Sequence, residues 1–95
     1  MELTPIPKGQ KGWKVRRLEL LIMEAMGRAT KPNTGWGIWQ KIKRISATDG
    51  DTVCLRMRSL SDRGYLIVNG SDPDCGYFYE LPPGMKNKNP DVSNK

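Results

Sequence analysis

Residues 49–68 read Asp49-Gly-Asp-Thr-Val-Cys-Leu-Arg-Met-Arg-Ser-Leu-Ser-Asp-Arg-Gly-Tyr-Leu-Ile-Val68. Within this stretch Val53, Met57 and Leu60 recur at the spacing of one helix face, which predicts a helix over residues 50–63 with a buried apolar stripe. The geometry of a helix then turns the opposite side of the segment, including Leu55, toward solvent. The fold class depends on what precedes and follows this helix.

The two ends of the predicted helix have matching signals. Asp49 or Asp51 can accept hydrogen bonds from the free amides at the helix start and complement the helix dipole. Gly64 lies where a left-handed residue commonly ends a helix. These signals place the helix between a capped start and a glycine turn.

Two segments rich in strand-forming residues follow the helix. They are Tyr65–Val68 and Tyr77–Leu81, and residues 69–76 between them are dense in turn formers. This pattern predicts a two-stranded β-hairpin. The Pro82-Pro-Gly sequence ends its second strand.

An amphipathic pattern near the N-terminus predicts a first helix over residues 13–28. Its apolar face consists of Val15, Leu18, Leu21, Ile22, Ala25, Met26 and Ala29. Leu20 and Met23 fall on the opposite side of this helix. Two alternatives stay open for these residues: they form the interface of a homodimer, or they pack against the C-terminal tail.

A second helix is predicted over residues 35–46, with Thr34 as its N-cap. Ile38, Ile42 and Ile45 share one face of this helix, which we expect to be buried. The other side is polar and cationic, and it consists of Gln40, Lys43 and Arg44, with Lys41 at the margin.

Three helices followed by a hairpin predict an α+β winged helix-turn-helix domain over residues 13–82. Residues 1–12 mix prolines, glycines and lysines, which predicts a flexible basic arm. Residues 83–95 are polar and without periodicity, so we expect a disordered tail. The three tryptophans are expected to pack in or beside the core, and they are Trp13, Trp36 and Trp39.

Charge is distributed unequally along the chain. The 95 residues include 16 Lys and Arg against 10 Asp and Glu, a formal net charge of +6. Residues 1–48 hold ten basic and three acidic side chains, so the positive charge is concentrated there. A basic half predicts an anionic partner, for which nucleic acid and an acidic membrane surface are the common choices. No apolar run approaches the ~20 residues of a membrane span, and we expect no membrane partner.

The residue types argue against catalysis and metal binding. Histidine is absent, and Cys54 and Cys75 are twenty-one residues apart, a spacing that matches no metal site. We therefore expect no enzyme activity, no cofactor and no small-molecule ligand. Because no cleavable signal segment is present, reduced thiols in the cytoplasm are favoured over a bridge between the two cysteines.

Several segments resemble known families of transcriptional regulators. Residues 52–66 resemble the recognition helix and exit turn of MarR-type regulators. The segments that resemble the PadR branch are Leu18-Glu-Leu-Leu-Ile-Met-Glu-Ala25, Gly35-Trp-Gly-Ile-Trp-Gln-Lys-Ile42 and Tyr77-Phe-Tyr-Glu-Leu81. The C-terminal dimerisation helix of that branch has no counterpart here. The resemblance implies that helix 50–63 enters the major groove of double-stranded DNA, that the second helix braces it, and that the wing contacts a neighbouring phosphate or the minor groove.

Two sets of DNA contacts follow from this arrangement. Arginine commonly pairs with guanine in the major groove, and apolar groups can meet the thymine methyl. The base-reading set is predicted on helix 50–63, and it comprises Leu55, Arg58 and Ser59 on the outward side with Thr52 and Arg56 toward the flanks. The phosphate-binding set is predicted to supply affinity rather than sequence information, and it comprises Lys8, Lys11, Lys14, Arg16, Arg17, Lys41, Lys43 and Arg44.

The wing tip departs from the expected pattern. It contains Asp72 and Asp74 and no cation, so a minor-groove contact would have to come from the N-terminal arm. The leading hypothesis is a small transcriptional regulator, or an accessory factor of a mobile element, that acts at the nucleoid of a bacterial or virus-infected cell. A winged-helix module that binds a protein partner without reading DNA is the alternative. RNA suits a helix reader less well because the deep groove of A-form RNA excludes side chains.

Overall fold

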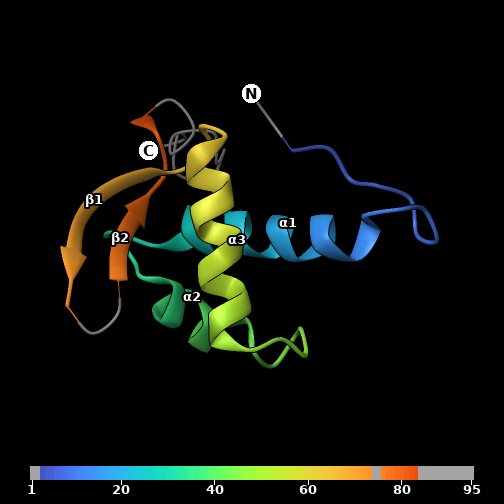
Figure 1. The fold of residues 1–95 in the computed structure, drawn as a ribbon, viewed down its shortest axis with the longest axis horizontal. Coiled ribbons are helices and arrows are strands. Elements are labelled where there is room, and N and C mark those ends of the chain that lie inside the picture. The colour runs from blue at the N-terminus through green and yellow to red at the C-terminus, as the bar shows by residue number, and fades with distance from the viewer. Residues whose placement is uncertain (1–2, 74–75, 84–95) are drawn as a thin grey trace, which may run out of the picture.

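The computed structural model describes residues 3–73 and 76–83 of the chain. Three helices precede two antiparallel strands (Figure 1), and their bounds are α1 (Trp13–Arg28), α2 (Gly35–Ile42), α3 (Gly50–Asp62), β1 (Ile67–Asp72) and β2 (Gly76–Glu80). The α+β class and the winged-helix layout are therefore confirmed. The predicted tail lies outside the described residues from Gly84 onward, as do Met1, Glu2, Asp74 and Cys75.

The third helix forms with both of its predicted ends. Asp49 Oδ1 accepts a hydrogen bond from the amide nitrogen of Thr52 at 2.8 Å. Hydrogen bonds from the side chain and backbone of Thr52 hold the pKa of Asp49 below its usual value of 3.8. At the other end Gly64 has a φ of +91°, a conformation that costs glycine little because it has no Cβ. Local chemistry therefore fixes where α3 begins and ends.

The core lies where the three helices and the base of the hairpin meet. Val53, Met57 and Leu60 are fully buried, as the stripe on α3 predicts. The other buried apolar residues are Leu18, Ile22, Ala25, Met26, Ile38, Ile42, Leu66, Tyr79 and Leu81. Each large aliphatic side chain contributes about 1.5–3 kcal/mol by leaving water. The burial of this stripe fixes the rotation of α3 and turns its opposite side outward.

Two glycines allow α2 and α3 to approach closely. A Cβ at Gly35 would lie 2.8 Å from the Cα of Cys54 and nearer still to its Sγ. A Cβ at Gly50 would overlap the ring of Trp36. Backbone cannot move aside as a side chain can, so Gly35 is the tighter of the two contacts.

The second helix is shorter than predicted, and this correction changes its buried face. It ends at Ile42 rather than at Ser46, because the chain turns after that residue and the amides of both Ile45 and Ser46 donate to the Ile42 carbonyl. Ile45 therefore leaves the helix face and is 56% exposed, whereas we predicted it to be buried. The N-cap prediction is confirmed, since the Thr34 hydroxyl accepts from the amide of Gly37 at 3.1 Å.

Two other residues predicted to face the core are exposed. Val15 is 45% exposed because it lies in the first turn of α1, where that helix extends beyond the other elements. Trp36 is 40% exposed, and its ring packs edge-on against Trp39 at 5.6 Å between centroids. Trp39 is half-buried against the core, as expected.

The hairpin is longer at its tip than the sequence predicts. Its strands cover residues 67–72 and 76–80, so residues 69–72, predicted as turn, extend the first strand. The register shifts between Val68 and Ser71, and Gly70 in that interval has a φ of +102°. This bulge keeps an Asn-Gly sequence within the ladder. Asn33 also pairs with Tyr79 through two backbone hydrogen bonds of 2.7 and 2.9 Å, which the sequence did not predict.

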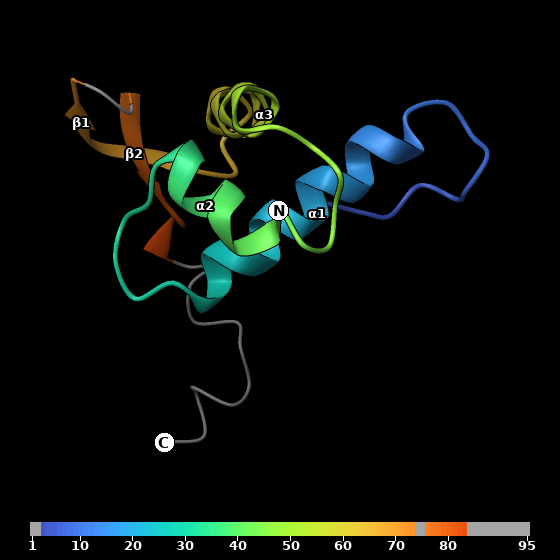
Figure 2. The same cartoon turned by 90° about the horizontal axis from the view of Figure 1, so that it is seen from below.

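Figure 2 shows α3 end-on, with α1 and α2 packed on one side of it. The hairpin lies beside α3 at one flank, and the first half of α1 with the N-terminal segment lies at the other (Figures 1 and 2). Among the described residues, no segment crosses the remaining side of α3. In this arrangement α3 lies between the hairpin on one side and the N-terminal half of α1 on the other.

Candidate functional site

The outer face of α3 consists of the residues opposite its buried stripe. Leu55 is 63% exposed at its centre, and Arg58 and Thr52 are also exposed. The exposed carboxylates Asp51 and Asp62 lie on the same face. The face therefore combines an apolar side chain, a hydroxyl, a guanidinium and two acids, and it is not uniformly cationic.

The predicted base-reading set divides between the two flanks of α3. Arg58 and Leu55 line a small hollow of about 230 Å³ on the hairpin side, together with Tyr77 and Tyr79. On the opposite side of α3, Ser59 and Arg56 are half-buried toward α1. Thr52, Leu55 and Arg58 are thus the members of the set that the fold exposes most.

A buried carboxylate joins α1 to the side of α3. Glu19 is only 2% exposed, and its Oε1 accepts from Arg16 Nε at 3.1 Å. Its Oε2 accepts a short hydrogen bond from Arg63 Nη2 and lies 3.6 Å from Arg56 Nη1. Arg16 also donates to the carbonyl oxygen of Thr4 at 2.6 Å. We call these four side chains, Glu19 with its three arginines, the Glu19 cluster.

The Glu19 cluster includes two arginines that were predicted to contact DNA. Arg56 was predicted to read bases and Arg16 to bind phosphate, yet both guanidiniums already have a carboxylate partner. Sequence reasoning missed Glu19, although a signal existed. It follows Val15 by four positions and precedes Ile22 by three, so it lies beside the apolar face of α1 where an acid needs a partner.

The predicted phosphate-binding residues fall into two groups. Lys11, Lys14 and Arg17 are exposed at the N-terminal end of α1, on the flank of α3 opposite the hairpin. Lys41 instead lines a separate hollow between α1 and α2 with Glu24 and Arg28. Lys8, Lys43 and Arg44 are exposed, and Lys43 lies over the Trp39 ring at 5.0 Å and Lys8 over the Trp13 ring at 5.8 Å. Arg16 is half-buried in the Glu19 cluster. The fold does not bring the whole set to one surface.

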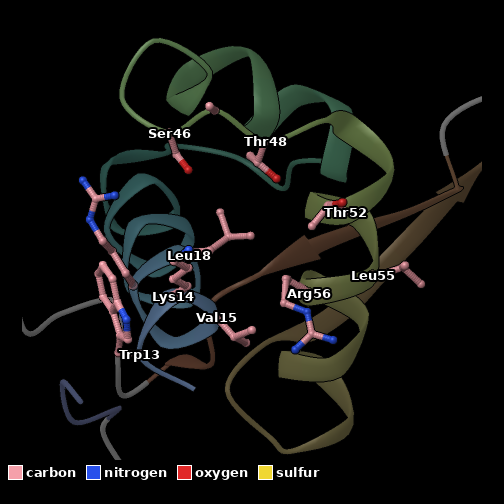
Figure 3. Close-up of a pocket in the computed structure, with 11 residues that line it drawn as sticks. Trp13, Lys14, Val15, Leu18, Ser46, Thr48, Thr52, Leu55 and Arg56 are labelled. Atoms are coloured by element: carbon pink, nitrogen blue, oxygen red, sulfur yellow. The ribbon is translucent and has the colours of Figure 1, made fainter. Parts of the chain in front are cut away.

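A cleft of about 570 Å³ separates α3 from the first half of α1. Figure 3 shows Val15 and Leu18 of α1 on one wall, Thr52 and Arg56 of α3 on the other, and Ser46 and Thr48 of the α2–α3 loop at one end. Leu55 lies at the outer edge and points away from the cleft (Figure 3). We call this hollow the α1–α3 cleft.

The hairpin flank differs in charge. The described residues of the two strands include no lysine or arginine, and Glu80 accepts from the Asn69 side chain at 2.9 Å. Asp74, the second acid of the predicted tip, lies outside the described residues. Tyr79 is buried beneath this flank, and its burial raises the pKa of its hydroxyl. Among the described residues the strands thus add no cation to the hairpin side, where Arg58 of α3 supplies a positive charge.

The described residues form neither a metal site nor a membrane-spanning helix. Over residues 3–73 and 76–83, no three cysteine, aspartate or glutamate side chains gather closely enough to hold a metal ion. No helix within those ranges combines the length and the apolar character needed to cross a bilayer. Comparison with family models, with curated proteins and with solved structures gives no match. The site must therefore be interpreted from its own residues.

Proposed function

We propose that this protein binds double-stranded DNA and that α3 enters the major groove. The observation that supports this most is the position of α3, which buries Val53, Met57 and Leu60 completely while its opposite side stays uncovered by the described chain. A helix fits the major groove of B-form DNA and can present three or four side chains to base edges.

Each exposed residue has a distinct proposed role. Arg58 donates two hydrogen bonds to a guanine, Leu55 contacts a thymine methyl, and Thr52 bonds to a base edge or phosphate. Ser59 has the same hydroxyl chemistry in a half-buried position. Arg56 stays with Glu19 and supports the helix from the side.

Affinity comes chiefly from the α1 flank in this proposal. Lys11, Lys14 and Arg17 bind the phosphates next to the contacted groove. Asp51 and Asp62 repel phosphates on the outer face of α3, which limits non-specific binding. On the resemblance to PadR-type and MarR-type regulators we further propose a small transcriptional regulator or an accessory factor of a mobile element.

The experiment is selection of duplexes from a random pool, followed by fluorescence anisotropy at several salt concentrations. The expected outcome is an enriched sequence whose affinity falls steeply with salt, because bound phosphates release counterions. Arg58→Ala should relax preference at one position by ~1–3 kcal/mol, whereas Lys14→Ala should weaken all sequences alike. Failure to enrich any duplex, together with a flat salt dependence, would contradict the proposal and favour a protein-binding module.

A further inference from the structure

We infer that the α1–α3 cleft is a docking site for an acidic amphipathic peptide segment of a partner protein. The inference rests on the shape, lining and charge of the cleft, and it stands whether or not α3 reads DNA. It assigns a second surface to the chain, one that adjoins the outer face of α3 without depending on Arg58.

The cleft is large enough to receive side chains from a partner. Its volume of about 570 Å³ falls in the range of ~300–1,000 Å³ that ligand pockets occupy. Three segments form it, namely the first half of α1, the α2–α3 loop and the first half of α3 (Figure 3). A helix or extended peptide can lie along such a hollow between two helices.

Much of the lining is apolar and open to solvent. Val15 is 45% exposed and ranks among the exposed large apolar residues of the described chain. Trp13 and Ala47 extend the apolar lining on the α1 side and the loop side. Contiguous exposed apolar surface with a polar rim is typical of protein interaction sites. A DNA backbone carries a charge at every phosphate and only small apolar faces on its sugars, so a peptide with large apolar side chains fits the cleft better than DNA does.

The charge of the rim selects an acidic partner. Lys14, Arg17 and Arg56 line the cleft, and none of its eleven lining residues is acidic. Arg56 is partly neutralised by Glu19 at 3.6 Å, but Lys14 and Arg17 form no ion pair among the described residues. Carboxylates on a partner would meet these two cations, while its apolar side chains enter the cleft against Val15.

The loop wall of the cleft is held in place before any partner binds. The indole nitrogen of Trp39 donates to the carbonyl oxygen of Thr48 at 2.7 Å. Asp49 caps the next helix through Thr52, which itself lines the cleft. A wall fixed in advance lowers the ordering cost of association.

Occupancy of the cleft also affects the proposed DNA surface. Thr52, Leu55, Lys14 and Arg17 belong to both sets, so a bound peptide and a bound duplex would compete. This consequence, unlike the docking site itself, rests on the proposed function. It would let a partner release the protein from DNA.

The test uses a fluorescein-labelled 16-residue helical peptide with Leu and Phe at positions i, i+3, i+4 and i+7 and Glu elsewhere. Two control peptides replace either the apolar residues by Ser or every Glu by Lys. We expect saturable binding of the first peptide alone in anisotropy titrations, with a shift of the Trp13 indole signal in NMR spectra. No binding of the first peptide, or equal binding of the Lys peptide, would overturn the inference.

Substitutions in the protein then test whether the peptide binds in the α1–α3 cleft. Val15→Asp should weaken peptide binding at least about tenfold, because it adds a carboxylate to the apolar lining. Ile45→Asp is the matched control, since Ile45 is 56% exposed but does not line the cleft, and it should bind as the natural chain does. The charge-reversed pair Lys14→Glu with Arg17→Glu should show the same loss as Val15→Asp, and circular dichroism verifies that each variant folds.

The same variants separate this inference from the proposed function. Arg58→Ala should lose duplex preference and keep peptide affinity, because Arg58 does not line the cleft. Val15→Asp should lose the peptide and keep the duplex. Equal peptide affinity of Val15→Asp and Ile45→Asp would overturn the docking site, and so would equal loss of duplex and peptide in Val15→Asp, which would assign the cleft to the DNA surface.

Discussion

The two flanks of α3 differ in charge and in residue type. On the α1 side, cations surround an apolar cleft, and the buried Glu19 ties three arginines from two helices together. On the hairpin side, Arg58 faces tyrosines, and the described strand residues include no cation. Both flanks border the same helix, but α1 supplies cations to one of them, whereas on the other the positive charge comes from Arg58 of α3 itself. In this winged-helix layout the first helix and the arm replace the wing as the source of positive charge.

The largest effect is expected from Glu19→Gln, which removes the charge that holds the α1 flank together. Three guanidiniums would then repel one another beside a side chain that is now neutral. Because these guanidiniums are partly exposed to water, the cost should be about 3 kcal/mol, the lower end of the range for breaking a buried ion pair. Urea unfolding should show this loss in the free energy of unfolding.

Glu24→Gln provides the comparison for Glu19→Gln on the same helix. Glu24 pairs with Arg28 at 3.2 Å, but both side chains are more than half exposed. Exposed pairs of this kind contribute about 0–1 kcal/mol, so this variant should unfold almost as the natural chain does. Equal stability of the two variants would show that the Glu19 cluster does not join the helices.

A smaller loss is expected from Gly35→Ala on the other side of α3. The added Cβ would lie 2.8 Å from the backbone of Cys54, which forces α2 away from α3 near the hairpin. Overpacking of this type costs about 1–3 kcal/mol. Gly27→Ala is the control, since a Cβ there meets nothing within 4 Å and should stabilise α1 by up to ~1 kcal/mol. Thermal unfolding of both variants would be compared, and a Gly35→Ala variant as stable as Gly27→Ala would refute the close approach.

The smallest effect is expected from a positive charge added to the hairpin flank. Ser71→Lys places a cation on the exposed first strand of the hairpin, whose described strand residues include none. If α3 lies in the major groove, the new lysine should reach a phosphate and steepen the slope of log affinity against log salt by ~0.9. Lys31→Ser, which removes an exposed lysine from the α1–α2 connector, should leave the slope unchanged. An unchanged slope in Ser71→Lys would mean that the hairpin does not approach DNA.

Local signals in the sequence predicted the elements well. The bounds of α1 are those expected, and α3 starts at the Asp49 cap and stops before Gly64, because caps and apolar spacing act over a few residues. The exposure of Leu55 and Arg58 followed from the same spacing. The end of α2 was wrong by four residues, since its apolar period continues to Ile45 while the chain itself turns.

The site was only partly predictable for a related reason. Leu55 and Arg58 could be placed because their own helix sets their direction, but the partners of Arg16 and Arg56 depend on Glu19. Arg56 is 37 residues from that acid along the chain. Spacing within one helix contains no information about such a partner. The same holds for the exposed Val15, whose burial depended on how far α1 extends past its neighbours.

By itself the sequence determined three helices, the N-caps of α2 and α3, the buried stripe of α3 and the order that ends in a hairpin, because each depends on neighbours within one or two turns of chain. Tertiary packing alone decided that Glu19 joins three arginines, that Asn33 adds a short strand beside Tyr79, and that a cleft opens between α1 and α3. These features form between segments that are distant in sequence. These contacts contribute to stability only after the helices have packed together.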